Sequence, residues 1–187
     1  MKISFVLLLL CCLGFSACTS RGSNVYSLVP NAVDSRPAII VIPGFYGSAL
    51  KEKTSGRRVF YTGLEPLFGT AALSLAQAEL GTPPGPELEV EGMLGAVSVI
   101  PALYEVEVYG PLIRSLRLQH PSAQILPLPY DWRDDLFLGV EKLHELVKVL
   151  QAKGSPKISV VAHSAGGLVL TYYLAYGNQP IDEAKIN

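Results

Sequence analysis

Short apolar runs alternate with amphipathic segments along most of the chain. Three of the runs are dominated by aliphatic residues, as expected for strands that are buried on both faces of a parallel sheet. They cover residues 38–42, 124–128 and 158–161. The pattern predicts a strand at each of these positions.

The segments that follow these runs have apolar residues at helical spacing. From Tyr109 to Leu116, apolar side chains recur at i, i+3, i+4 and i+7, which gives one apolar helix face. Residues 136–150 repeat the pattern, and a third helix-like segment extends from residue 168 to residue 176. This alternation of strand and helix predicts a three-layer α/β fold with a mostly parallel sheet.

Residues 51–101 interrupt the alternation. The segment 71–80 is rich in helix-forming residues, whereas 87–90 and 96–100 resemble short strands. A cluster of glycine and proline at 81–86 breaks any regular element between them. We expect a lid-like insertion over 51–101 within a single domain that spans residues 37–187.

The N-terminus has the pattern of an export signal. Lys2 precedes an apolar run that ends at Phe15, too short to cross a bilayer, so residues 1–17 are expected to be a signal peptide. The sequence Phe15-Ser16-Ala17-Cys18 resembles the lipobox of bacterial lipoproteins, in which the cysteine is lipidated after cleavage. The alternative is an ordinary secretory signal that is cleaved near Ala17. Residues 18–36 are small and polar and are expected to be a flexible tether.

Composition narrows the possible partners and cofactors. The net charge of −1 over 187 residues gives no basic surface for nucleic acid, so no nucleic-acid partner is expected. All three cysteines, Cys11, Cys12 and Cys18, lie in the leader or at its end, which leaves no disulfide framework or cysteine metal site in the domain. No metal and no cofactor are expected.

The candidate chemistry is centred on Ser164. An apolar strand leads into Ala162-His163-Ser164-Ala165-Gly166-Gly167, and a helix follows, which is the layout of a nucleophile elbow. The small residues two positions on either side of the serine, Ala162 and Gly166, allow the sharp turn, although the usual motif has glycine at both places. The alternative is that Ser164 only caps the helix that follows.

Two further segments are candidates for an oxyanion hole. The N–H of Ala165, at the start of the helix, would face negative charge that develops on a bound ester. The turn after the first strand, Pro43-Gly44-Phe45-Tyr46-Gly47-Ser48, would supply the second donor from the N–H of Phe45 or Tyr46. The alternative for this segment is an ordinary turn.

Three segments together resemble the lecithin:cholesterol acyltransferase family of α/β-hydrolases, which includes lysosomal phospholipase A2 and bacterial relatives. They are, in order, Val41-Ile42-Pro43-Gly44-Phe45-Tyr46-Gly47-Ser48, Tyr130-Asp131-Trp132-Arg133 and Ala162-His163-Ser164-Ala165-Gly166-Gly167. The resemblance implies an acyl-serine mechanism on a lipid ester or phospholipid, with Asp131, Trp132 and Arg133 bracing the site. Alternatively, Arg133 pairs only with Asp131 or Asp134, and Trp132 is a core residue. With the export signal, the resemblance implies an envelope protein that is anchored to the membrane through Cys18.

The sequence lacks the rest of a catalytic triad. In this fold the order is serine, then an acid, then histidine, whereas His120, His144 and His163 all precede Ser164. His120 is expected to cap the C-terminus of a helix, and His163 is too close to the serine to act as its base. Asp182 comes too early to be the acid. We therefore expect a truncated, inactive hydrolase whose strand 158–162 forms an exposed sheet edge, or a non-catalytic lipoprotein that uses a partial hydrolase scaffold for binding.

Overall fold

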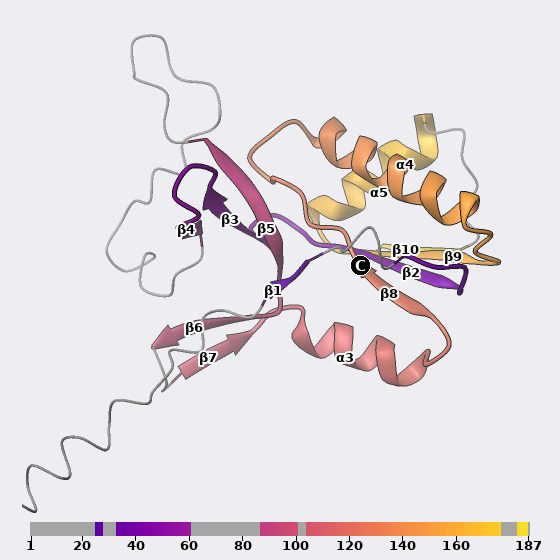
Figure 1. The fold of residues 1–187 in the computed structure, drawn as a ribbon, viewed down its shortest axis with the longest axis horizontal. Coiled ribbons are helices and arrows are strands. Elements are labelled where there is room, and N and C mark those ends of the chain that lie inside the picture. Colours follow the sequence, from indigo (N-terminus) through magenta and orange to yellow (C-terminus); the bar gives the residue numbers. More distant parts are fainter. Residues whose placement is uncertain (1–24, 28–32, 61–86, 101–103, 177–182, 187) are drawn as a thin grey trace, which may run out of the picture.

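The computed structural model describes residues 25–27, 33–60, 87–100, 104–176 and 183–186. At its centre is a parallel four-stranded sheet with the strand order β10-β9-β2-β8 (Figure 1). The strands are β2 (Ala38–Ile42), β8 (Gln124–Pro127), β9 (Ile158–Ala162) and β10 (Glu183–Ile186). The three predicted strands are thus confirmed, and the three-layer α/β, hydrolase-like fold with them.

Alternate residues of β2 face the two layers that cover the sheet. Ile40 and Ile42 belong to a large apolar cluster that includes residues of α4 (Leu136–Ala152) and α5 (Ala165–Tyr176). Ile39 and Val41 belong to a smaller cluster with Ile113 of α3 (Gly110–Gln119). Figure 1 shows α4 and α5 on one face of the sheet and α3 on the other. Burial on both faces explains why β2 consists only of aliphatic residues.

The helix boundaries follow local sequence signals. Pro111 lies in the first turn of α3, where its missing N–H is not needed. The side chain of Asp135 caps α4 by accepting a hydrogen bond from the Phe137 N–H at 3.0 Å. Helix α5 begins at Ala165, as expected from the elbow, because the tight turn at Ser164 leads directly into it, and the apolar helical pattern from residue 168 is its later part.

The segment predicted to be an insertion contains antiparallel strands. A second sheet has the order β1-β5-β3-β4, and β6 pairs with β7 in a separate hairpin. These strands are β1 (Val25–Tyr26), β3 (Ser48–Glu52), β4 (Arg58–Phe60), β5 (Leu88–Leu94), β6 (Ala96–Ile100) and β7 (Tyr104–Glu107). The short strands predicted near 87–90 and 96–100 are therefore present, whereas the helix-friendly segment 71–80 lies outside the described residues.

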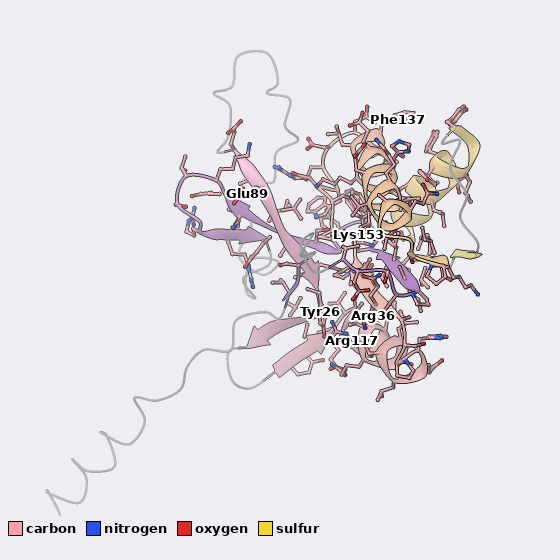
Figure 2. The ribbon with its side chains drawn as sticks, turned by 45° about the vertical axis from the view of Figure 1, so that its right-hand side comes forward. Tyr26, Arg36, Glu89, Arg117, Phe137 and Lys153 are labelled. Carbon is pink, nitrogen blue, oxygen red and sulfur yellow. The ribbon has the colours of Figure 1, made fainter. Side chains whose placement is uncertain are left out.

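Two expectations are corrected. Strand β9 is not an edge strand, because β10 pairs with it in parallel register, with Ala184 opposite Val160. Part of the predicted tether is also attached to the domain: Val25–Tyr26 pair with β5, and Val33 is buried in the large cluster. The guanidinium of Arg117, on α3, lies 5.5 Å from the centre of the Tyr26 ring and holds β1 against that helix (Figure 2).

The predicted signal peptide and Cys18 lie outside the described residues. Within the described part, no helix is both long enough and apolar enough to cross a bilayer.

Candidate active site

Ser164 lies at the junction of β9 and α5 and is exposed. Its φ angle is 53°, in the left-handed region that few residues other than glycine adopt. The turn is fixed by the main chain, since the His163 N–H donates to the Ile42 carbonyl at 3.1 Å and the Gly166 N–H donates to the His163 carbonyl at 2.9 Å. This is the geometry of the predicted elbow.

Two glycines allow the elbow to approach the end of β2. A Cβ atom at Gly166 would lie 2.5 Å from the Pro43 carbonyl oxygen, and a Cβ atom at Gly44 would lie 2.8 Å from the Cβ of Ser164. Both distances are shorter than any van der Waals contact. The turn after β2 can therefore lie directly against Ser164 only because neither position has a side chain.

The other predicted oxyanion donors, the N–H groups of Phe45 and Tyr46, directly follow Gly44, the residue of the turn after β2 that lies against Ser164. Tyr46 has a φ of 60°, so the only two described non-glycine residues with positive φ lie in this turn and in the elbow. The N–H groups of Phe45 and Ala165 make no hydrogen bond among the described residues. The Ser164 hydroxyl also makes no described hydrogen bond to α5, so the alternative in which it caps the helix has no support.

The Tyr109 hydroxyl joins the turn to the elbow. It accepts a hydrogen bond from the Gly44 N–H at 2.8 Å and lies 2.8 Å from Nδ1 of His163. Tyr109 is only 7% exposed, and burial raises the pKa of its hydroxyl, although the bond from Gly44 opposes that shift. The hydroxyl therefore stays protonated at neutral pH and can donate to His163. A cavity of about 260 Å³ opens beside this pair.

Sequence reasoning missed this role of Tyr109, which was predicted only as part of an apolar helix face. The available signal was its position immediately before Gly110 and Pro111, where the side chain lies at the N-terminal end of α3. A tyrosine at such a position can bury its ring and still present its hydroxyl to a neighbouring element.

The Asp131-Trp132-Arg133 segment contacts the turn after β2 through Trp132. The Trp132 ring packs edge-on against Phe45 and Tyr46, with ring centres 4.9 and 4.4 Å apart, and its Nε1 donates to the Ser48 carbonyl at 3.2 Å. Arg133 and Asp131 form a two-bond ion pair of 2.6 and 3.0 Å. Trp132 thus contacts the turn, but it also belongs to the large apolar cluster, and Arg133 pairs with Asp131, so both parts of the alternative interpretation are present.

No general base is present at Ser164 among the described residues. His163 is adjacent to the serine, but its Nδ1 faces Tyr109. His120 ends α3 at the surface, and the ring centre of His144 lies 6.2 Å from that of Tyr173. The structure therefore places the turn that contains Phe45 and Tyr46, which pack on Trp132, against the elbow of Ser164 and Ala165, and the described residues supply no acid and histidine pair there.

The comparison with protein families can now be set beside this geometry. Residues 132–186 match the family model described as "Putative serine esterase (DUF676)". The match begins at Trp132 and contains α4, β9, the elbow, α5 and β10. It supports a serine hydrolase-like family with an esterase-like function. No curated protein matches the chain.

Proposed function

We propose that the chain carries the nucleophile and oxyanion hole of a serine esterase or O-acyltransferase that acts on lipid esters. One observation carries the proposal: Ser164 is exposed at a φ of 53° between β9 and α5, against a glycine turn. The serine-esterase match to residues 132–186 supports the same reaction class.

In this mechanism the Ser164 oxygen attacks the carbonyl carbon of the ester while a general base takes its proton. The carbonyl oxygen becomes an oxyanion, which the N–H groups of Ala165 and of Phe45 or Tyr46 stabilise by about 3 kcal/mol each. The bond to the leaving alcohol then breaks, and the alcohol departs with a proton. Water or a second alcohol attacks the acyl-serine, which releases a free acid or a new ester.

The lipid preference follows from the surroundings of the serine and from the family resemblance. Phe45 and Tyr46, in the turn that lies against the elbow, are about half exposed, 53% and 52% respectively. They offer an apolar contact for an acyl chain, and Trp132 holds both rings in place. The Tyr130–Arg133 segment resembles lecithin:cholesterol acyltransferase and lysosomal phospholipase A2, which favours a phospholipid or another lipid ester as donor. A lipid anchor at Cys18 would place the enzyme on the bacterial envelope, beside this substrate.

A fluorophosphonate probe tests the nucleophile, because it labels only serines that are activated for attack. We expect the full chain to be labelled at Ser164 when imidazole is added as an external base, and Ser164→Ala to abolish labelling. Ser122→Ala, which removes an exposed serine far along the chain from the elbow, is the matched control and should leave labelling unchanged.

The outcome also separates the two candidate functions. No described residue supplies a base at Ser164, which is the observation that favours a non-catalytic lipoprotein. Absence of Ser164-specific labelling, even with imidazole, would reject the esterase proposal and leave that binding role.

A further inference from the structure

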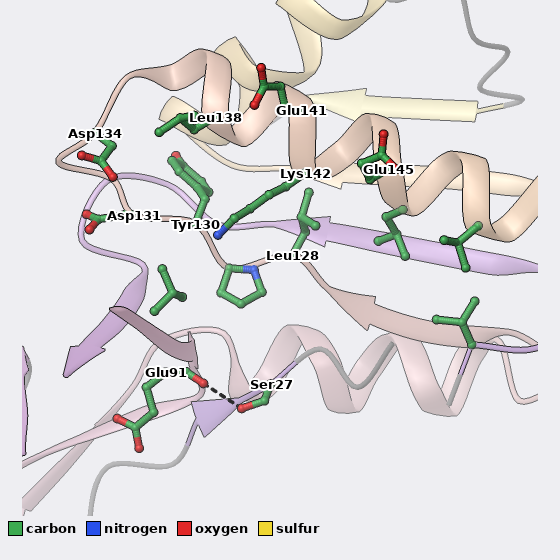
Figure 3. Close-up of a pocket in the computed structure, with 15 residues that line it drawn as sticks. Ser27, Glu91, Leu128, Tyr130, Asp131, Asp134, Leu138, Glu141, Lys142 and Glu145 are labelled. Carbon is green, nitrogen blue, oxygen red and sulfur yellow. Dashed lines mark hydrogen bonds between the residues drawn. The ribbon is translucent and has the colours of Figure 1, made fainter. Parts of the chain in front are cut away.

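A second cavity lies on the α4 side of the fold, apart from the elbow (Figure 3). Its volume is about 670 Å³, within the range of small-molecule sites. None of the elbow residues, from His163 to Gly167, lines it. Its walls are mostly aliphatic and come from Val33, Val90, Leu128, Leu138, Leu146 and Val149.

Among the described residues that line this cavity, Lys142 is the only basic one. Figure 3 shows its side chain extending from α4 into the cavity, with the amine directed toward Tyr130. Lys142 makes no ion pair or hydrogen bond within the described part of the chain, whereas Lys148 on the same helix pairs with Glu145 at 3.3 Å. A cation without a counter-ion that faces an apolar cavity favours an anionic ligand with an apolar body.

None of the five acidic residues of the lining forms a described ion pair with this amine. Glu91 is held by Arg58 in two bonds of 2.5 and 2.6 Å, and Asp131 is held by Arg133. Glu141 and Glu145 direct their carboxylates away from the cavity (Figure 3). Asp134, the remaining acid, precedes α4 at one end of the cavity.

We infer that this cavity binds a free fatty acid in its carboxylate form. The carboxylate pairs with the Lys142 ammonium, and the hydrocarbon chain lies along the aliphatic walls. Charge-assisted hydrogen bonds of this kind are stronger than neutral ones, and burial of each methylene group adds to the affinity. The site is non-covalent and does not depend on Ser164, although an esterase that acts on lipids would release this ligand.

Calorimetric titration of the full chain with laurate, below its micelle-forming concentration, tests the inference. Laurate is expected to bind, and Lys142→Met to weaken its binding by about tenfold or more, since the aliphatic stem remains and only the charge is lost. Lauryl alcohol has the same chain without the charge, so its weaker binding should not change in this variant. Lys148→Met is the matched control on α4 and should leave both affinities unchanged.

Two more variants separate this site from the elbow. Leu138→Trp fills the cavity and is expected to abolish binding of both ligands, whereas Leu118→Trp adds the same ring at an exposed site on α3 and should not. Ser164→Ala is expected to bind laurate with wild-type affinity, so failure of the esterase proposal would leave this result standing. The inference is overturned if wild-type protein does not bind laurate, or if Lys142→Met weakens laurate and lauryl alcohol equally.

Discussion

At the scale of single residues, backbone strain marks the candidate site. Ser164 and Tyr46 have φ angles of 53° and 60°, and both lie where β9 and β2 end. Such conformations cost on the order of 1–3 kcal/mol and persist only when the surrounding packing enforces them. The hydrogen bond from His163 to Ile42 and the close approach of Gly166 to Pro43 provide that packing. The exposed hydroxyl of Ser164 is thus held in place at a cost in stability.

This strain predicts that two small substitutions at Ser164 differ in their effect on stability. Ser164→Gly removes the Cβ that disfavours positive φ, so it is expected to raise the free energy of unfolding by about 1 kcal/mol. Ser164→Ala keeps the Cβ and is expected to give no such gain. Urea denaturation of the two variants measures the difference, and an equal gain in both would show that strain at this position is not the cause.

The sequence predicted the position of Ser164 but not the role of the Tyr109 hydroxyl, which contacts both the turn after β2 and the elbow. The elbow is a local pattern, since a strand, small residues and a helix follow one another within a few positions. The bonds of Tyr109 instead span 65 residues to Gly44 and 54 residues to His163. They depend on how α3 packs against the sheet, which no local pattern contains.

At the scale of elements, the junction of β9 and α5 depends on close contact with β2. The three predicted strands and three predicted helices were found because their hydrophobic periods are strong. The sequence pattern did not predict β10, the second neighbour of β9 in the sheet. This strand contains only four residues, and two of them are charged. Its place is determined by pairing with β9 rather than by its own composition.

Gly166→Ala tests how closely the two elements must approach. The added Cβ would lie 2.5 Å from the Pro43 oxygen and 2.7 Å from the Ile42 oxygen, both on the main chain, so β2 and α5 must separate. We expect a loss of at least about 3 kcal/mol in the free energy of unfolding. Gly154→Ala is the control: its φ is 76° and no atom lies within 4 Å, so only backbone strain of about 1 kcal/mol is expected. Similar losses in urea denaturation would contradict the packing argument.

At the scale of the whole molecule, the large apolar cluster contains two tyrosine hydroxyls without a described partner. They belong to Tyr130 and Tyr173, which are 2% and 0% exposed. Burial raises the pKa of both groups, and that of Tyr130 to about 12. An unpaired buried hydroxyl also costs free energy at every pH. The core is therefore less stable than its apolar area alone would suggest.

Tyr130→Phe is expected to change both the level and the pH dependence of stability. Removing the unpaired hydroxyl should raise the free energy of unfolding at neutral pH by about 1 kcal/mol. In the wild type, the contribution of Tyr130 is complete below pH 10 and declines as the pH rises toward about 12, because the unfolded tyrosine ionises first.

Tyr130→Phe lacks this decline in stability, whereas the declines caused by Tyr109 and Tyr173, whose pKa values are also raised, remain. Urea denaturation between neutral pH and pH 12 measures both effects. Tyr104→Phe, at a side chain that is 57% exposed, serves as the control at neutral pH. If stability declined as steeply with pH in Tyr130→Phe as in the wild type, the ionisation of Tyr130 could not be a cause of the decline.

The Tyr109 hydroxyl, which contacts both Gly44 and His163, also affects which hydrogen bonds the imidazole of His163 can make. The Gly44 N–H donates to the tyrosine oxygen, and a phenolic hydrogen directed at Nδ1 would occupy the lone pair there. A neutral ring in that state carries its own hydrogen on Nε2. In that tautomer Nε2 would be a hydrogen-bond donor, unable to remove a proton from Ser164.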